Sequence, residues 1–278
     1  MGKPDTLGDD ASEHERALFK CRMAENAERF DDMVSFIRKA CESSTEPLGP
    51  NERNYLSVAY KNSVGARRNA LRCLTAMKHK YEQKEASINV KIIDDYYAAV
   101  LEELVGICNE VLNLIDKQIL RPEVLNDLKD DLSAREFKVF FHKMYADYYR
   151  YLSEFATGGD KTVAIQKASE NYKKAMESAS QGLPPSHPIR LGLCLNYSVF
   201  LYEIEDQPKE AKELAKKAFD EALDNLDSAG ELEYKDSTLI LQLLRDNTTL
   251  WCSQDNDSNT GAPAAPQPGP ADQKPAAP

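Results

Sequence analysis

Proline spacing constrains the fold of this chain more than any other feature of its sequence. Of its 14 prolines, those from Pro263 onward cluster at the end of the chain. The others stand at Pro4, Pro47, Pro50, Pro122, Pro184, Pro185, Pro188 and Pro208. The long segments between them are rich in Ala, Leu, Lys and Glu and poor in Gly, a composition typical of helices, whose interiors exclude proline. We therefore predict an all-α protein whose helices are separated by short turns.

Apolar periodicity agrees with this prediction. Leu239, Leu243 and Leu250 recur at i, i+4 and i+11, so they share one face of a helix with Asn247 at i+8. The sequence has no strand-type alternation of useful length. We expect about nine helices, near residues 13–27, 30–43, 50–82, 90–119, 123–157 (with a break near Ser133), 161–181, 187–205, 208–226 and 231–252.

The two ends of the chain differ in composition from the region between them. Residues 254–278 are rich in Pro and Ala and almost without large apolar side chains, so burial cannot offset the entropy lost on ordering. Residues 1–12 have a similar character. A chain of 278 residues fits one large domain or two ordinary ones. We predict disordered ends at 1–12 and 254–278 and a folded domain over 13–253.

Charge and cysteine usage argue against several classes of protein. The chain has 35 Lys and Arg against 46 Asp and Glu, a net charge of −11, which argues against a general nucleic-acid binder. No apolar run approaches the ~18 residues of a membrane helix, so we expect no membrane insertion. The N-terminus lacks the apolar core of a secretory signal, and the six scattered cysteines have no CxxC spacing. We expect a cytoplasmic protein with reduced thiols, with the nucleus as a second compartment.

No catalytic or metal-binding motif is found in the sequence. The four histidines show neither an HExxH pattern nor metal-ligand spacing, and there is no Walker loop and no GxGxxG. No pattern places a nucleophile beside a base. We therefore predict that the protein is not an enzyme and uses neither a cofactor nor a metal. An enzyme with a buried catalytic carboxylate or cysteine is an alternative.

Two stripes of basic residues are more informative. Lys61, Arg68 and Arg72 stand at i, i+7 and i+11, and Lys143, Arg150 and Tyr151 at i, i+7 and i+8. On continuous helices each set projects along one line. One interpretation is a solvated basic face that pairs with nearby acids. The other is a positive pocket for phosphate, which Arg binds bidentately and to which Lys and a Tyr hydroxyl also donate. Spacing alone leaves both interpretations open.

At these same residues the sequence resembles the 14-3-3 family. The segment RNYLSVAYKNSVGARR at residues 53–68 is similar to the first family signature, and YKDSTLILQLLRDN at residues 234–247 is similar to the second. Between them, DYYRYL at residues 147–152 and HPIRLGL at residues 187–193 match further landmarks in the family's order. The resemblance covers residues 13–253 and identifies this region as a 14-3-3-like phosphopeptide-binding domain.

The resemblance implies both a fold and a function. It implies a dimer of all-antiparallel, nine-helix protomers, each with a concave amphipathic groove. The family is an example of phosphosite recognition by arginine clusters. The chain would then be a non-catalytic adaptor that binds phosphoserine and phosphothreonine motifs of client proteins and regulates their activity, location or association. Its partners would be those clients and a second protomer, as a homodimer or as a heterodimer with paralogues.

Site residues are carried over by position. The family's phosphate-binding set is matched by Lys61, Arg68, Arg150 and Tyr151. The peptide groove is matched by Arg72, Lys143, Leu195, Asn196, Val199, Glu203, Leu239, Leu243, Asn247, Leu250 and Trp251. In the family, the two asparagines bind the peptide backbone, the two basic residues assist, and the Glu and Trp form a further polar pair. The leucines and the valine form the apolar wall, although without the resemblance their spacing would indicate protein core.

The family's dimer contacts are only partly kept. The resemblance places Arg29 opposite Glu103 of the second protomer and puts Met23, Ala27, Leu74 and Tyr96 at the apolar interface. Asp32 matches the acid of a second ion pair, but Ala99 stands at the position of its lysine. One exposed ion pair contributes only ~0–1 kcal/mol, so its loss should not prevent dimerisation. The segment Leu120–Ser133 looks longer than the family's loop, and its role is open.

A helical-repeat scaffold that binds peptides regardless of phosphorylation is the second alternative. The segments NYKKA at residues 171–175 and AKKAF at residues 215–219 resemble parts of tetratricopeptide repeats. However, no period of ~34 residues recurs along the chain.

Overall fold

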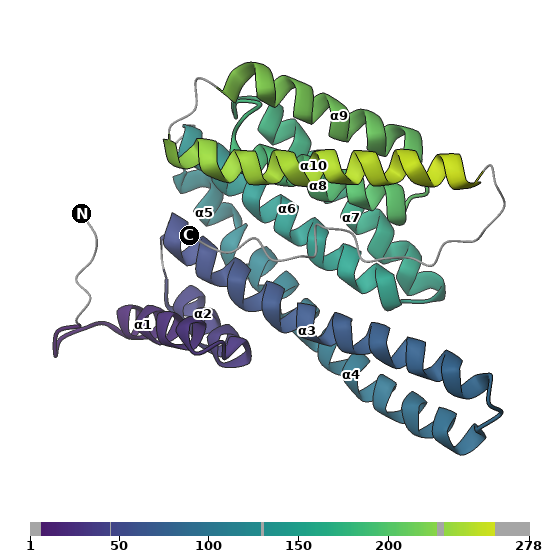
Figure 1. The fold of residues 1–278 in the computed structure, drawn as a ribbon. Coiled ribbons are helices and arrows are strands. Elements are labelled where there is room, and N and C mark those ends of the chain that lie inside the picture. Colours follow the sequence, from purple (N-terminus) through teal and green to yellow (C-terminus); the bar gives the residue numbers. More distant parts are fainter. Residues whose placement is uncertain (1–6, 45, 129–130, 227–230, 259–278) are drawn as a thin grey trace. The chain divides into compact units, whose positions relative to one another are not determined.

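The computed structural model describes residues 7–44, 46–128, 131–226 and 231–258 and, within these ranges, contains helices and no strands (Figure 1). The chain divides into two compact units, residues 1–128 and 129–278, and each is described here by itself. None of the helices in the described ranges has both the length and the apolar composition needed to cross a membrane.

Unit 1 is built on a long antiparallel hairpin of two helices. These are α3 (Pro50–Glu82) and α4 (Ser87–Leu114), which Figure 1 shows running side by side. The helices α1 (Glu13–Asn26) and α2 (Phe30–Ser43) pack on each other and on α3. At its C-terminal end α4 continues into a π-helical turn, η1 (Ile115–Ile119), before the short α5 (Pro122–Asp127). The side chains buried completely in this unit include Met33, Ile37, Leu56, Tyr60 and Leu104.

The described residues of unit 2 form five helices with a continuous apolar interior. They are α6 (Leu132–Phe155), α7 (Gly158–Ser180), α8 (Pro188–Glu203), α9 (Pro208–Asn225) and α10 (Glu231–Ser258). One cluster packs α8, α9 and α10 together around Trp251. A second packs α6, α7 and α8 around Tyr172 and Phe200, whose ring centroids lie 5.2 Å apart. The helix α8 belongs to both clusters and therefore joins them.

Helix starts follow local sequence signals. Ser12 and Glu15 form a reciprocal capping box at the start of α1, and the Asp131 side chain accepts the Ala134 N–H at 2.9 Å at the start of α6. Prolines stand in the first turns of α3, α8 and α9, where the missing N–H costs no helical hydrogen bond.

The all-α prediction is confirmed. The described ranges contain ten α-helices because the segment 123–157, which was expected to break near Ser133, forms the separate helices α5 and α6. The segment Leu120–Ser133 therefore contains a helix of its own, α5. The helix α4 begins at Ser87 rather than near 90, and α7 at Gly158 rather than near 161.

The final helix is longer than expected. It runs to Ser258, past both the expected helix end at 252 and the expected start of the tail at 254, because neither Pro nor Gly follows Trp251 within this stretch. At the other end, Arg16 donates to the carbonyl oxygens of Asp9 at 2.9 Å and Ala11 at 2.8 Å. The remaining parts of the two ends predicted to be disordered, residues 1–6 and 259–278, lie outside the described residues.

Candidate functional site

The basic stripe of unit 1 lies on one uninterrupted helix. Because α3 continues from Pro50 to Glu82, Lys61, Arg68 and Arg72 project along one face, as their spacing predicts. Arg68 is 6% exposed, whereas Lys61 and Arg72 are half-buried. Burial raises the pKa of the Cys108 thiol on α4 to about 12, and the positive charge of Arg68 partly opposes this shift. The Arg68 guanidinium on α3 is therefore close enough to α4 to influence the ionisation of that thiol.

The basic stripe of unit 2 lies on α6. Arg150 and Tyr151 are both buried, and the Arg150 guanidinium lies 4.7 Å from the centroid of the Tyr151 ring. This distance is typical of a cation–π contact, which fixes the guanidinium against the ring. Lys143, two helical turns earlier, is half-buried and its Nζ lies 2.8 Å from Oδ2 of Asp147.

Asp147 is the centre of a polar network that the sequence analysis did not single out. Its carboxylate is buried and accepts hydrogen bonds from Lys143, from the Tyr172 hydroxyl at 2.5 Å and from the Asn196 side-chain nitrogen at 2.9 and 3.0 Å. Burial alone would raise the pKa of this carboxyl, but the charges of Lys143 and Arg150 and the hydrogen bonds lower it below its usual value. The carboxylate therefore stays ionised at neutral pH.

The predicted groove residues of α8 share one face but differ in exposure. Asn196 is half-buried, Val199 is buried and Glu203 is exposed at the end of the helix. Leu195 is buried and belongs, with Val199, to the apolar cluster of α8, α9 and α10. The two apolar side chains thus pack mainly inside unit 2, and Asn196 combines partial exposure with hydrogen bonds to Asp147.

The predicted groove face of α10 contains both exposed leucines and a buried amide. Leu239 is 45% and Leu250 36% exposed, and Leu243 is half-buried. Asn247 is 1% exposed, and its Nδ2 has no hydrogen-bond acceptor among the described residues. A buried donor without an acceptor costs free energy.

Trp251 is more deeply buried than its expected role in a polar pair implies. It is 3% exposed and packs in the cluster of α8, α9 and α10. Its place next to Glu203 in the family's groove stays a prediction.

The four predicted phosphate-binding residues divide between the two units. Lys61 and Arg68 belong to α3 of unit 1, and Arg150 and Tyr151 to α6 of unit 2. Within unit 2, the Asp147 network brings Lys143 and Asn196 together on one carboxylate. The joint action of the two basic stripes stays a prediction.

Most of the predicted dimer residues are exposed in unit 1. These are Met23, Ala27, Arg29, Tyr96 and Glu103, whereas Leu74 is 8% exposed and offers little surface to a second copy. Arg29, the N-cap residue of α2, forms an ion pair with Asp32 of that helix. Glu103 accepts from Nε of Arg67 at 3.0 Å, and Arg67 also donates to Asp31 at 2.7 Å. Spacing predicts no role for Arg67, because its two carboxylate partners lie on other helices.

The exposed apolar surface of α4 extends beyond the predicted dimer residue Tyr96. Ile88 is 76%, Ile92 62% and Tyr96 61% exposed. They stand at i, i+4 and i+8 and therefore line one face of α4. Their spacing was visible in the sequence, but only the burial of the neighbouring side chains reveals which face of α4 the protein leaves uncovered.

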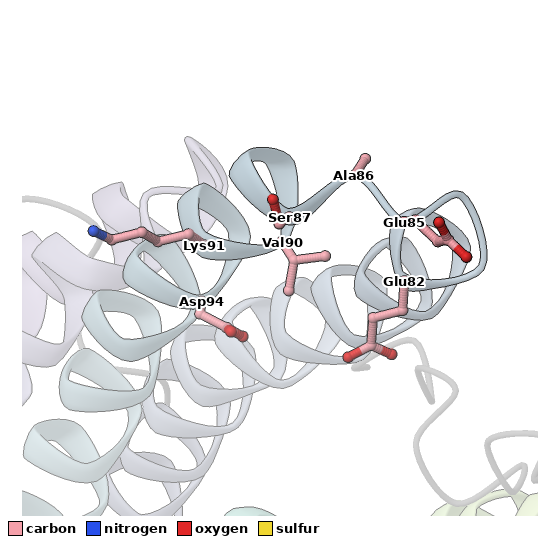
Figure 2. A pocket seen from close by; sticks show the side chains of 7 residues that line it. All are labelled: Glu82, Glu85, Ala86, Ser87, Val90, Lys91 and Asp94. Atoms are coloured by element: carbon pink, nitrogen blue, oxygen red, sulfur yellow. The ribbon is translucent and has the colours of Figure 1, made fainter.

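A hollow of about 400 Å³ lies at the turn between α3 and α4 (Figure 2). Its lining includes Glu82, Glu85 and Asp94, and the side chain of Lys91 extends away from the two glutamates. Since the carboxylates dominate its charge, this hollow is unsuited to a phosphate group. Within the described ranges, no group of three or more His, Cys, Asp and Glu side chains is arranged to hold a metal ion.

Comparison with known proteins gives one consistent family. The family model described as 14-3-3 protein matches residues 20–252. The chain is 46% identical over 254 residues to the 14-3-3 protein epsilon of Drosophila melanogaster, across 90% of this chain and 93% of that relative. It is 44% identical over 259 residues to the 14-3-3-like protein GF14 epsilon of Arabidopsis thaliana, across 92% and 98% of the two chains. It is 45% identical over 245 residues to a 14-3-3 protein homolog of Trichoderma harzianum, across 88% and 90%.

Proposed function

Since this chain belongs to the 14-3-3 family of phosphopeptide-binding adaptors, we propose that it binds phosphoserine and phosphothreonine motifs through its two basic stripes. In this proposal Lys61 and Arg68 of α3 and Arg150 and Tyr151 of α6 hold one phosphate group. The protein acts by masking or fixing the client segment and performs no catalytic step.

The observation that carries the proposal is the burial of two arginines in an acidic protein. The net charge is −11, yet Arg68 and Arg150 are 6% and 4% exposed and each stands on a stripe with further donors. A phosphate dianion facing such groups gains charge-assisted hydrogen bonds of about 1.5–3 kcal/mol each. An unphosphorylated serine gains none of these bonds, so phosphorylation would decide whether a client binds.

The rest of the client segment would lie along α8 and α10. The partly exposed Leu239, Leu243 and Leu250 provide apolar surface for side chains beside the phosphorylated residue. Asn196 and Asn247 would hydrogen-bond the peptide backbone, and the partial exposure of Asn196 supports this role for the first of them. Arg72, Lys143 and Glu203 would supply accessory polar contacts.

We further propose that the protein acts as a dimer. The exposed side chains of Met23 and Tyr96 support this, as does the apolar stripe of α4 that continues from Tyr96 to Ile92 and Ile88. A dimer would present two phosphate sites, and linking two sites raises avidity through effective concentration. The six free cysteines support a reducing compartment, hence the cytoplasm or nucleus.

Fluorescence anisotropy with a labelled Arg-Ser-x-phosphoserine-x-Pro peptide tests the proposal. We expect the unphosphorylated peptide to bind at least about 100-fold more weakly, since two or more charge-assisted bonds are lost. Lys61→Glu should reduce the affinity for the phosphopeptide to a similar degree. Lys84→Glu makes the same charge change on an exposed lysine beyond the end of α3 and should leave the affinity within about twofold.

Two outcomes would contradict the proposal. Equal affinity for both peptides would favour the phosphorylation-independent scaffold. Equal losses with Lys61→Glu and Lys84→Glu would mean that net charge alone, and not a specific stripe on α3, attracts the phosphopeptide.

A further inference from the structure

We propose that Asp147 is a positioning residue that holds the Asn196 side-chain amide in the orientation that presents its oxygen to the backbone N–H of a bound client. The inference rests on the proposed function, because it concerns how the same site receives the peptide backbone.

The hydrogen bonds around Asp147 determine this orientation. The Asn196 nitrogen lies 2.9 Å from Oδ1 and 3.0 Å from Oδ2 of the carboxylate. An ionised carboxylate only accepts hydrogen bonds, so the alternative amide orientation would set the Asn196 oxygen against two acceptors. The nitrogen must therefore face Asp147, and the amide oxygen, on the other branch of the planar amide, is directed away from that carboxylate. The residue as a whole is partly exposed.

The surroundings of Asp147 keep it both ionised and immobile. Nζ of Lys143, one turn earlier on α6, lies 2.8 Å from Oδ2, and the Tyr172 hydroxyl on α7 lies 2.5 Å from Oδ1. The residue is 6% exposed, and the charge of Arg150 on the same helix also favours the carboxylate form. The side chains of Lys143 on α6 and Tyr172 on α7 thus hold the Asp147 carboxylate in place, and this carboxylate fixes the orientation of the Asn196 amide.

The substitution Asp147→Asn separates this role from electrostatic attraction. It removes a negative charge beside Lys143 and Arg150, which by itself would strengthen the attraction of phosphate. It also replaces the two acceptor oxygens of Asp147 with one acceptor oxygen and one donor NH₂ group. Since either end of the Asn196 amide can then find a partner, Asn196 loses its preferred orientation. A positioning role predicts that Asp147→Asn binds the client more weakly, although the loss of the negative charge favours phosphate.

A double-mutant cycle with Asn196→Ala measures whether the effect acts through Asn196. Affinity for a fluorescent phosphopeptide is measured for the full-length wild type, Asp147→Asn, Asn196→Ala and the double variant. We expect each single substitution to weaken binding about fivefold, the loss of one neutral hydrogen bond. The double variant should bind no more weakly than Asn196→Ala alone. A double variant whose loss equals the product of the two single losses would overturn the inference.

Ser237→Ala is the matched control. It removes one buried hydrogen bond of unit 2, from the Ser237 hydroxyl to the Ser186 carbonyl oxygen at 2.6 Å, and leaves the hydrogen bonds of the Asp147 carboxylate in place. It should lower the melting temperature and leave phosphopeptide affinity within about twofold. A loss of affinity equal to that of Asp147→Asn would show that general loosening of unit 2, and not the orientation of Asn196, weakens binding.

Nuclear magnetic resonance of the wild type gives a test that does not depend on the folding of any variant. The side-chain NH₂ resonances of Asn196, assigned by through-bond correlation to its own backbone amide, should be protected from solvent exchange before and after the phosphopeptide is added. Rapid exchange in the unbound protein would overturn the inference. Equal binding of phosphorylated and unphosphorylated peptides by the wild-type protein would contradict the proposed function. That result is independent of how well the Asn196 NH₂ group is protected from exchange.

Discussion

The rings of Trp251 on α10 and Tyr202 on α8 lie 4.6 Å apart between centroids, with their planes within 10° of parallel. The Tyr202 hydroxyl also donates to the side-chain oxygen of Gln254 at 2.9 Å, one helical turn beyond the tryptophan. Trp251 is 3% exposed and is the only tryptophan of the chain. Its fluorescence therefore reports directly on the packing of the last helix against α8.

Removing the stacked partner should loosen the last helix measurably. In Tyr202→Ala, Trp251 loses a ring contact and α10 loses a hydrogen bond to α8, so we expect a red-shifted emission and about 2 kcal/mol less unfolding free energy in urea. Tyr234→Ala, on an exposed residue of α10, is the control and should change that free energy by less than about 0.5 kcal/mol. Equal effects of the two substitutions would contradict a specific role of the stack.

Thiol reactivity should distinguish two classes of cysteine. Cys73 and Cys252 are exposed, and the other four are buried. Burial is the largest cause that raises the pKa of Cys21 and Cys41 to about 12 and that of Cys194 to about 11. At pH 8 a disulfide reagent should label the exposed pair rapidly and the buried four only after denaturation. Rapid labelling of Cys21 or Cys41 in the folded protein would contradict their burial.

The same shifts predict lower stability in alkali. In the unfolded chain the thiols ionise near their usual pKa of 9.0, while the folded chain keeps those of Cys21 and Cys41 protonated up to about 12. Between these values the folded state binds more protons, so the free energy of unfolding falls as pH rises. Urea titrations at pH 8 and pH 10.5 should show this decline, and Cys21→Ala should make it shallower. An unchanged pH slope would contradict a protonated Cys21 thiol in the folded state.

The apolar stripe of α4 should decide the oligomeric state. The double substitution Ile92→Glu with Tyr96→Glu places charges on the proposed contact and should convert a dimer into a species near the 31.2 kDa of one chain, measured by analytical ultracentrifugation. Val163→Glu is the control, since Val163 is 55% exposed on α7 of unit 2. A dimer that survives the α4 substitutions would place the interface elsewhere.

The parts of the fold that are set by local sequence could be predicted well. Pro50, Pro188 and Pro208 each mark a helix start, because proline fits only the first turn of a helix and the signal needs no tertiary information. The extension of α10 to Ser258 was missed because the local sequence there has neither a strong helix signal nor a strong stop signal.

The polar networks could not be predicted from spacing. The hydrogen-bond partners of Asp147 on other helices lie 25 and 49 residues away in the sequence, and Glu103 lies 36 residues from Arg67. Helical periodicity identifies which residues share a face, but not which neighbouring helix covers that face. For this reason the deep burial of Asn247 and Trp251 also appeared only in the structure.

The most direct test of the central claim is the affinity of one phosphopeptide, measured by isothermal titration calorimetry, for Arg68→Ala and for Arg150→Ala. These substitutions remove one arginine from α3 of unit 1 and one from α6 of unit 2, and Arg245→Ala on an exposed residue of α10 is the control. If both stripes hold the same phosphate, each of the first two variants should lose at least about tenfold in affinity and the control should lose less than about twofold. Wild-type affinity in either Arg68→Ala or Arg150→Ala would contradict a phosphate shared by the two stripes.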